Sequence, residues 1–251
     1  MRKLLLATTA ALGLAASFGV VSADVITIDV WNGVPFSHNA IEANIPAVAP
    51  GAVLTFTTNP GLGLNAINWR NSNAFGGSNT FGDFFFSNGV ALCGPISCIL
   101  PTGTLVLTSG SAQFPTMTSL IGATMSTSDI GTDISTFLTL VNPTALPAGT
   151  AFNVEHDDGA SAYENVTVPG SGIGFSDGIT LFEHGQEAFD SSQVATTSAL
   201  STNVAFTYSE DNGAPAILVV TPAAVPEPAS LTLLGSALVG LGWLGRRRRA
   251  A

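Results

Sequence analysis

Short runs of β-favouring residues, separated by turn-forming residues, most constrain what this chain can fold into. Between Val25 and Thr221 these runs are rich in Val, Ile, Thr and Phe, and clusters of Gly, Pro, Asn and Ser separate them. No long segment shows the helical periodicity of apolar residues. Short strands broken by frequent turn signals are typical of all-β domains. We therefore predict an all-β fold, an antiparallel β-sandwich or jelly roll, over residues 24–224.

The strand pattern is clearest in Val204–Tyr208, where apolar and polar residues alternate, which predicts one buried and one wet face. A short helix is expected at Ala40–Ile45 and a loop at Asn71–Gly82. The predicted strands are Val25–Trp31, Val53–Thr58, Ala66–Trp69, Asp83–Ser87, Thr104–Thr108, Ser135–Val141, Ala151–His156, Ala160–Val168, Ile179–Glu183, Val204–Tyr208 and Ala216–Thr221.

The charges are distributed very unevenly along the 251 residues. Six of the seven basic residues lie close to the two termini, and Arg70 is the only basic residue between Asp24 and Ala224. Nearly all of the 17 acidic residues lie in that same region. A nucleic-acid partner needs a basic face, which this composition excludes. An anionic membrane surface is disfavoured for the same reason.

The two cysteines, Cys93 and Cys98, enclose the turn-forming sequence Gly-Pro-Ile-Ser. Two thiolates without nearby histidines do not complete a zinc site, and the spacing is not that of a redox Cys-x-x-Cys motif. In an exported protein the pair predicts a structural disulfide that closes a tight loop. So short a loop contributes roughly 2 kcal/mol to stability.

The N-terminus has the pattern of a secretory signal peptide. Arg2 and Lys3 are followed by an apolar stretch, Leu4–Val21, and then by the small-residue pattern Val-Ser-Ala. Signal peptidase reads such a pattern, so we predict cleavage between Ala23 and Asp24. Residues 1–23 are therefore expected to be a signal peptide.

The C-terminus carries a second signal, over residues 225–251. The segment Leu231–Gly245 is uncharged and mostly apolar, and we expect it to form a single transmembrane helix. Positive charge after the helix holds that end in the cytoplasm, which places the preceding domain outside. The flanking residues are Val225, Pro226, Glu227 and Pro228 before the helix and Arg246, Arg247, Arg248 and Arg249 after it.

This order of Pro-Glu-Pro, apolar helix and arginine cluster resembles the PEP-CTERM sorting domain. The resemblance implies recognition by an exosortase, a membrane enzyme that removes the tail and delivers the domain to the surface. It also implies a Gram-negative bacterium that makes exopolysaccharide and biofilm, with an inner-membrane-anchored precursor whose domain lies in the periplasm. An ordinary membrane anchor that is never cleaved is the alternative.

Two acidic segments are the strongest candidates for chemistry. Glu155–Gly159 (Glu-His-Asp-Asp-Gly) lies between two predicted strands and is expected to be a loop. Ser209–Gly213 (Ser-Glu-Asp-Asn-Gly) lies between the last two predicted strands. Carboxylates on neighbouring loops supply the oxygen ligands that calcium prefers. The alternative is that the Asp-Gly and Asn-Gly pairs only form turns, and spacing alone favours it.

The residues around the first acidic segment resemble the protective-antigen-type domain, a β-sandwich found in toxins, glycosidases and yeast adhesins. The resemblance rests on Leu146–Val154, followed by His156–Ser161 with its Asp-Asp-Gly sequence. Ala162 and the pair Glu164–Asn165 depart from the family pattern, since the family has a larger apolar residue at the first position and Asp-Gly at the second.

In the adhesin members of that family an adjacent Asp pair binds calcium, and the calcium holds a sugar. The resemblance implies that Asp157 and Asp158 are the corresponding pair, with Asn212 or Asp211 as the ligand from the second segment. Tyr163 is a candidate for stacking on a sugar, with core packing as its alternative. We expect Trp69 and the run Phe84–Phe86 to lie in the core.

The sequence offers little support for an enzyme. The common hydrolase, metalloprotease and phosphate-loop motifs are missing, and the three histidines are scattered. Glycoside hydrolysis needs two carboxylates across a cleft, a separation that the adjacent Asp157 and Asp158 do not give by themselves. We expect a non-enzymatic protein without cofactors other than calcium.

The leading hypothesis is an exported surface or extracellular-matrix protein that binds carbohydrate in a calcium-dependent, adhesin-like way. Its expected partners are signal peptidase and exosortase during export, the membrane through the C-terminal helix before processing, and exopolysaccharide or other glycans afterwards. One alternative is a purely structural biofilm protein without a ligand, and another is a cryptic secreted hydrolase.

Overall fold

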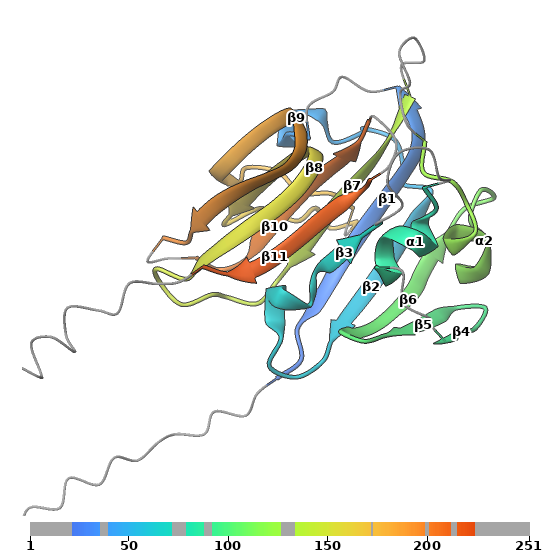
Figure 1. Ribbon diagram of the computed structural model, residues 1–251, viewed down its shortest axis with the longest axis horizontal. Coiled ribbons are helices and arrows are strands. Elements are labelled where there is room, and N and C mark those ends of the chain that lie inside the picture. The colour runs from blue at the N-terminus through green and yellow to red at the C-terminus, as the bar shows by residue number, and fades with distance from the viewer. Residues whose placement is uncertain are drawn as a thin grey trace, which may run out of the picture.

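The strands in the described part of the chain form one antiparallel sheet with the order β3-β11-β8-β10-β7-β1-β2-β6-β5-β4, and β9 pairs with β8 (Figure 1). This confirms the predicted all-β, antiparallel class. The strands are β1 (Val25–Pro35), β2 (Ala52–Thr58), β3 (Asn68–Arg70), β4 (Leu92–Cys93), β5 (Ser97–Leu100), β6 (Gly103–Gly110), β7 (Ile134–Asn142), β8 (Ala151–Glu164), β9 (Ile179–Thr196), β10 (Val204–Glu210) and β11 (Ile217–Pro222).

The helices are few and short, and they are η1 (Glu42–Asn44), η2 (Gly63–Ala66), α1 (Phe81–Phe86) and α2 (Met117–Ile121). This computed structural model describes residues 22–35, 40–71, 79–87, 92–126, 134–171, 173–198, 201–211 and 215–223, with the backbone alone for residues 185–194.

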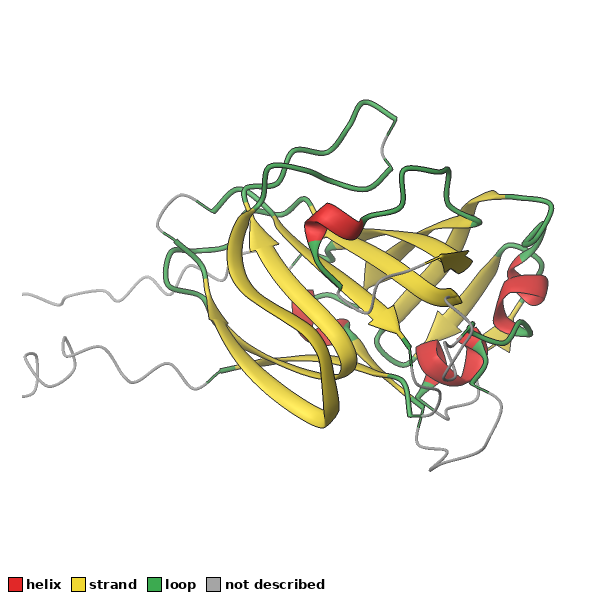
Figure 2. Ribbon diagram, turned by 90° about the horizontal axis from the view of Figure 1, so that it is seen from above, coloured by secondary structure: helices red, strands yellow, loops and turns green. Residues whose placement is uncertain are grey.

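The sheet curls around a single large core (Figure 2). Trp69 on β3 and Phe56 on β2 are distant in the strand order, yet their ring centroids lie 5.6 Å apart in an edge-to-face arrangement. The alternating pattern of β2 explains this packing, because Leu54 and Phe56 are buried while the intervening threonines are half-exposed. Aromatic burial of this kind supplies much of the stability of a β domain.

The half of the sheet around β10 is covered on both faces. Every residue of β10 is buried, although its sequence alternates and predicted one wet face. Tyr208 packs in the main core, whereas Ala205 packs on the other face with Tyr163 and Phe175. The prediction of a wet face was therefore wrong, because Ile45, Val166 and Phe175 pack against that face.

The predicted strand Asp83–Ser87 is the helix α1. Thr80 accepts a hydrogen bond from the Asp83 N–H at 3.0 Å, and the Asp83 carboxylate accepts one from the Thr80 N–H at 3.3 Å, which together make a capping box. Phe81, Phe84 and Phe85 lie on one face at helical spacing and are buried in the core. The prediction that Trp69 and this aromatic run belong to the core is confirmed for Trp69, Phe84 and Phe85, while Phe86 is half-buried.

One other prediction differs from the structure. The strands predicted at Ala151–His156 and Ala160–Val168 are the single strand β8, so Glu155–Gly159 is not a loop. The short helix predicted at Ala40–Ile45 is confirmed as the 3₁₀ helix η1, over Glu42–Asn44. The predicted loop Asn71–Gly82 falls mostly outside the described residues, and its last two residues begin α1.

The disulfide between Cys93 and Cys98 is present, with the Cα atoms 4.1 Å apart. It joins directly opposed residues of the β4–β5 hairpin, whose two strands were not predicted from the sequence. The Gly94 N–H donates to the Ser97 carbonyl at 2.8 Å and closes the turn. The predicted structural role of the cysteine pair is confirmed.

Both ends of the described domain lie at the same end of the sheet. The Asp24 N–H donates to Thr58 Oγ1 at 2.9 Å, and the Asp24 carboxylate accepts from Asn142 Nδ2 at 3.0 Å. Pro222, the last residue of β11, lines the same small cavity of about 200 Å³ as Asp24. In the described part of the chain, no helix has the length and apolar character needed to cross a membrane.

Candidate functional site

The Asp-Asp-Gly sequence lies in the middle of β8, where the strand is irregular. Asp158 has a φ of 57°, and the register between β8 and β9 shifts on both sides of it. Asp tolerates this left-handed conformation better than most residues, at a cost of order 1 kcal/mol. Such bulges change the direction in which a side chain points, relative to the regular alternation of a strand. They are common beside functional sites.

Gly159 allows Ala40 and Ser209 to pack closely against this irregular part of β8. A Cβ atom at Gly159 would lie 3.0 Å from the Ala40 nitrogen and 2.6 Å from Ser209 Oγ. Thr207 donates a short hydrogen bond to the Ala40 carbonyl from the same face. The glycine therefore lets the segment before η1 lie directly on β8 and β10.

Four carboxylates gather where β8 meets the end of β10, and we call Asp157, Asp158, Glu210 and Asp211 the acidic cluster. All four are buried, with exposed fractions from 0% for Glu210 to 8% for Asp157. The Asp211 N–H donates to Asp158 Oδ2 at 2.8 Å, which joins the two predicted segments directly. The structure therefore brings together three of the four predicted ligands, and Asn212 lies outside the described residues.

Glu210 belongs to the acidic cluster but was not among the predicted ligands. Its Oε1 accepts from Asn79 Nδ2 at 3.0 Å, and its Oε2 accepts from the Tyr208 hydroxyl at 2.6 Å. Burial raises the pKa of Glu210 well above its usual value, and the charge of Asp158 raises it further. The sequence did contain a signal, because Glu210 continues the alternate positions of Phe206 and Tyr208 onto the core face.

In the part of the chain that the structure describes, Arg70 is the only lysine or arginine side chain. Arg70 pairs with Glu155, with Nη2 2.9 Å from Oε2, at a partly exposed position. His156 is buried, and its Nδ1 lies 3.1 Å from the Asp158 carbonyl oxygen. When Nδ1 carries a hydrogen, it donates a hydrogen bond to this carbonyl. Burial penalises the ionised form of a carboxylate, so this arrangement favours either protonation or a bound cation.

The described residues do not by themselves complete a metal site. Within the part of the chain that the structure describes, no group of three His, Cys, Asp or Glu side chains is placed to hold a metal ion. The carboxylate oxygens of Asp157 and Asp158 are of the right chemical type for calcium, which prefers six to eight oxygen ligands. A calcium ion here would need further oxygens from Asn212, from water or from a ligand.

Tyr163 is not placed to stack on a sugar, because its side chain is only 1% exposed. Its hydroxyl accepts from the Glu42 N–H at 2.8 Å and donates to Glu183 Oε1 at 2.8 Å, and its ring packs against Phe175. Burial raises the pKa of its hydroxyl. Tyr163 thus holds η1 and β9 on the sheet, and its assignment as a sugar-binding residue was wrong.

The acidic cluster and the two ends of the described domain, Asp24 and Pro222, lie at opposite ends of the sheet. In the pairing of β10 with β7, Val204 is opposite Asn142, which bonds to Asp24, and Glu210 is opposite Thr136. Six residues of strand correspond to roughly 20 Å. The predicted signal peptide, apart from Ser22 and Ala23, and the whole C-terminal tail lie outside the described residues.

The fold and site define an antiparallel β domain with a buried acidic cluster, and the chain ends in a recognised sorting signal. The family model described as the PEP-CTERM protein-sorting motif matches residues 224–249. This match confirms the sequence-based recognition of the tail and marks the chain as an exported surface protein processed by an exosortase.

Two solved structures are similar to this chain. One is the PA14 sugar-binding domain from an RTX adhesin, with 13% identity and a TM-score of 0.43, covering 82% of this chain and 93% of that one. The other is the PA14 domain of the MpAFP antifreeze protein, with 13% identity and a TM-score of 0.41, covering 79% of this chain and 82% of that one. No curated protein matches the sequence.

Proposed function

We propose that this chain is an exported, non-enzymatic surface protein whose β domain binds carbohydrate through calcium at the acidic cluster. The observation that carries the proposal is the direct contact between Asp158 Oδ2 and the Asp211 N–H, which unites two acidic segments 53 positions apart in one buried place. Asp157 and Asp158 would supply calcium ligands, and Asp211 and Asn212 would complete the protein's share.

Electrostatics supports a cation at this position. Burial and mutual repulsion work against ionised carboxylates in the acidic cluster, as the raised pKa of Glu210 indicates. A divalent ion would offset that repulsion, and when bound it would supply open coordination positions for sugar hydroxyls. The polar bonds from Asn79 and Tyr208 would meanwhile hold Glu210 in place.

The position of the cluster in the molecule suits a surface protein. A domain tethered through its C-terminal end would carry the acidic cluster at the far end of the sheet, away from the cell. We propose cleavage by signal peptidase after Ala23, a temporary inner-membrane anchor with Arg246–Arg249 in the cytoplasm, and exosortase cleavage near Pro226–Pro228. The partners at the surface would then be exopolysaccharide or other glycans.

Calcium binding is tested by thermal unfolding of the purified protein. A ligand at about 100 times its dissociation constant stabilises the folded state by about 2.7 kcal/mol, so calcium at about 1 mM should raise the melting temperature by several degrees. Asp157→Asn should abolish this rise. Asp177→Asn, which changes an exposed aspartate elsewhere, should keep it.

A scaffold without a ligand is the second candidate, and one contact favours it. Asp158 Oδ2 already accepts a hydrogen bond from the Asp211 N–H. This hydrogen bond can stabilise the fold without any bound ion. If calcium at millimolar concentration leaves the melting temperature unchanged in the parent protein, the calcium proposal fails and the scaffold stands.

A further inference from the structure

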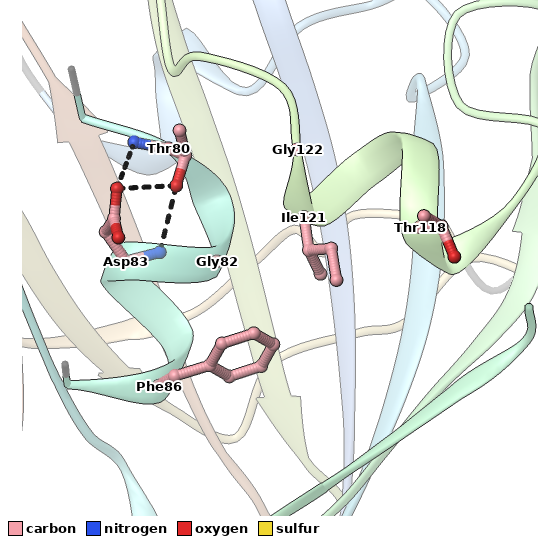
Figure 3. A pocket seen from close by; sticks show the side chains of 7 residues that line it. All are labelled: Thr80, Gly82, Asp83, Phe86, Thr118, Ile121 and Gly122. Carbon is pink, nitrogen blue, oxygen red and sulfur yellow. Dashed lines mark hydrogen bonds between the residues drawn. The ribbon is translucent and has the colours of Figure 1, made fainter. Parts of the chain in front are cut away.

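A groove of about 570 Å³ runs between α1 and α2 (Figure 3), and its lining includes no residue of the acidic cluster among the described residues. Thr80, Asp83 and Phe86 line it on one side, and Thr118 and Ile121 line it on the other. The helices are joined by the Phe81 N–H, which donates to the Ala123 carbonyl at 3.1 Å. The volume lies in the range of small-ligand sites, roughly 300–1,000 Å³.

Two glycines shape this groove. A Cβ atom at Gly82 would come within 2.9 Å of the Ile121 carbonyl oxygen, so the glycine permits the close approach of the two helices. The same position is 3.5 Å from Phe86 Cε2, which places the Phe86 ring beside the contact. Gly122 lines the groove after Ile121 and adds no side chain to fill it.

The groove combines an apolar surface with polar groups at its sides. Phe86 and Ile121 project into the space between the helices (Figure 3), and Phe86 is half-buried, so its ring is held while part of it faces the groove. The Thr80 N–H and hydroxyl both donate to Asp83 Oδ2, at 3.3 and 2.7 Å, and no described residue donates to Oδ1. The Thr118 side chain is exposed at the opposite wall.

We propose that this groove is a second, calcium-independent binding site for a neutral saccharide. A pyranose ring has an apolar face suited to stacking on Phe86 and hydroxyl groups suited to the Asp83 carboxylate and the Thr118 hydroxyl. The Asp83 charge disfavours anionic ligands, and none of the described residues that line the groove is a lysine or an arginine. The proposal goes beyond the acidic cluster, with which the groove shares no residue.

The test uses saturation-transfer NMR on the full chain, purified in a detergent without a sugar headgroup and kept in EDTA. The probes are three neutral trisaccharides, made of β-glucose, α-mannose and β-galactose. At least one of them should receive saturation from the protein, and competition should give a millimolar or tighter affinity. EDTA removes any contribution from calcium, so failure of the calcium proposal does not affect the result.

Two variants assign the signal to the groove. Phe86→Ala should weaken binding at least tenfold by removing the stacking ring, and Thr118→Trp should block binding by filling the groove from an exposed position that the core does not need. Leu92→Ala changes a side chain that is 73% exposed outside the groove and should bind as the parent does. Circular dichroism checks that each variant is folded.

The outcomes separate the two sites. If none of the trisaccharides binds in EDTA, or if binding persists unchanged in folded Thr118→Trp, the groove is not a saccharide site. Binding that appears only with calcium and is lost in Asp157→Asn would assign sugar recognition to the acidic cluster alone and overturn the inference.

Discussion

Glu210 is fully buried, and both of its carboxylate oxygens accept hydrogen bonds inside the protein. Its raised pKa has a direct consequence for stability. Unfolding returns the pKa to its usual value, so between the two values the folded state holds a proton that the unfolded state releases. The free energy of unfolding therefore falls as pH rises through this interval.

Replacing Glu210 with Gln should remove this contribution. We expect Glu210→Gln to lose less stability than the parent between about pH 5 and about pH 8, measured by urea unfolding in EDTA. Asp29 also has a raised pKa from burial, but it contributes equally to both proteins and cancels in the comparison. Identical slopes for parent and variant would show that Glu210 does not carry a raised pKa in the folded protein.

The protective-antigen-type resemblance selected part of the candidate site, because residue spacing alone favoured turns at both acidic segments. The structure places Asp157, Asp158 and Asp211 together, and their role as calcium ligands stays a prediction. Tyr163 was misassigned, and Glu210 was not selected, because their surroundings come from segments far away in the sequence. Tyr163 bonds to Glu42, and Glu210 bonds to Asn79, at separations of 121 and 131 residues.

At the level of the elements, α1 was predicted as a strand because aromatic residues favour strands. The overlooked signal is the Thr80–Asp83 capping box, which precedes aromatic residues at helical spacing. β8 was divided in two because Asp-Gly is a common turn sequence. In the structure the same pair forms a bulge inside a long strand, held by pairing with β9 and β10 that no local pattern reveals.

The β4–β5 hairpin is held by the Cys93–Cys98 disulfide. We expect the double change Cys93→Ser and Cys98→Ala to lower the free energy of unfolding by about 2 kcal/mol, because it frees the unfolded loop. Alanine is chosen at the second position because Cys98 is buried. Urea unfolding measures the change.

Reduction of the parent protein provides the control for this prediction. A reducing agent should lower the stability of the parent to that of the double variant and leave the variant unaffected. A double variant as stable as the oxidised parent would mean that the hairpin, rather than the disulfide, fixes this edge of the sheet.

For the molecule as a whole, we expect the sorting motif to determine the cellular location of the β domain. Changing Pro226 and Pro228 together to Ala should stop processing, so that the protein accumulates in the membrane fraction at its precursor size. Immunoblots of membrane and surface fractions measure this, with Pro222→Ala, just outside the matched motif, as the control. Normal release of the double variant would mean that these prolines are not part of the processing signal.

The overall topology was less predictable than the class of fold. The short runs of β-favouring residues predicted an antiparallel β domain. The N-terminal and C-terminal sequence signals predicted export. The curl that brings Trp69 against Phe56, and the segments that cover the second face of β10, depend on contacts between distant parts of the chain. The same long-range pairing places the acidic cluster away from Asp24, at the start of the described domain, as the proposed orientation of the domain requires.

Calcium-dependent carbohydrate binding at the acidic cluster is tested by glycan-array binding of the purified protein in calcium and in EDTA, with Thr118→Trp as background to remove any contribution from the groove. We expect glycan signals that appear in calcium, disappear in EDTA, and are lost in Asp157→Asn but kept in Asp177→Asn. Glycan binding that is the same in calcium and EDTA, or no binding in calcium at all, would contradict the proposed function.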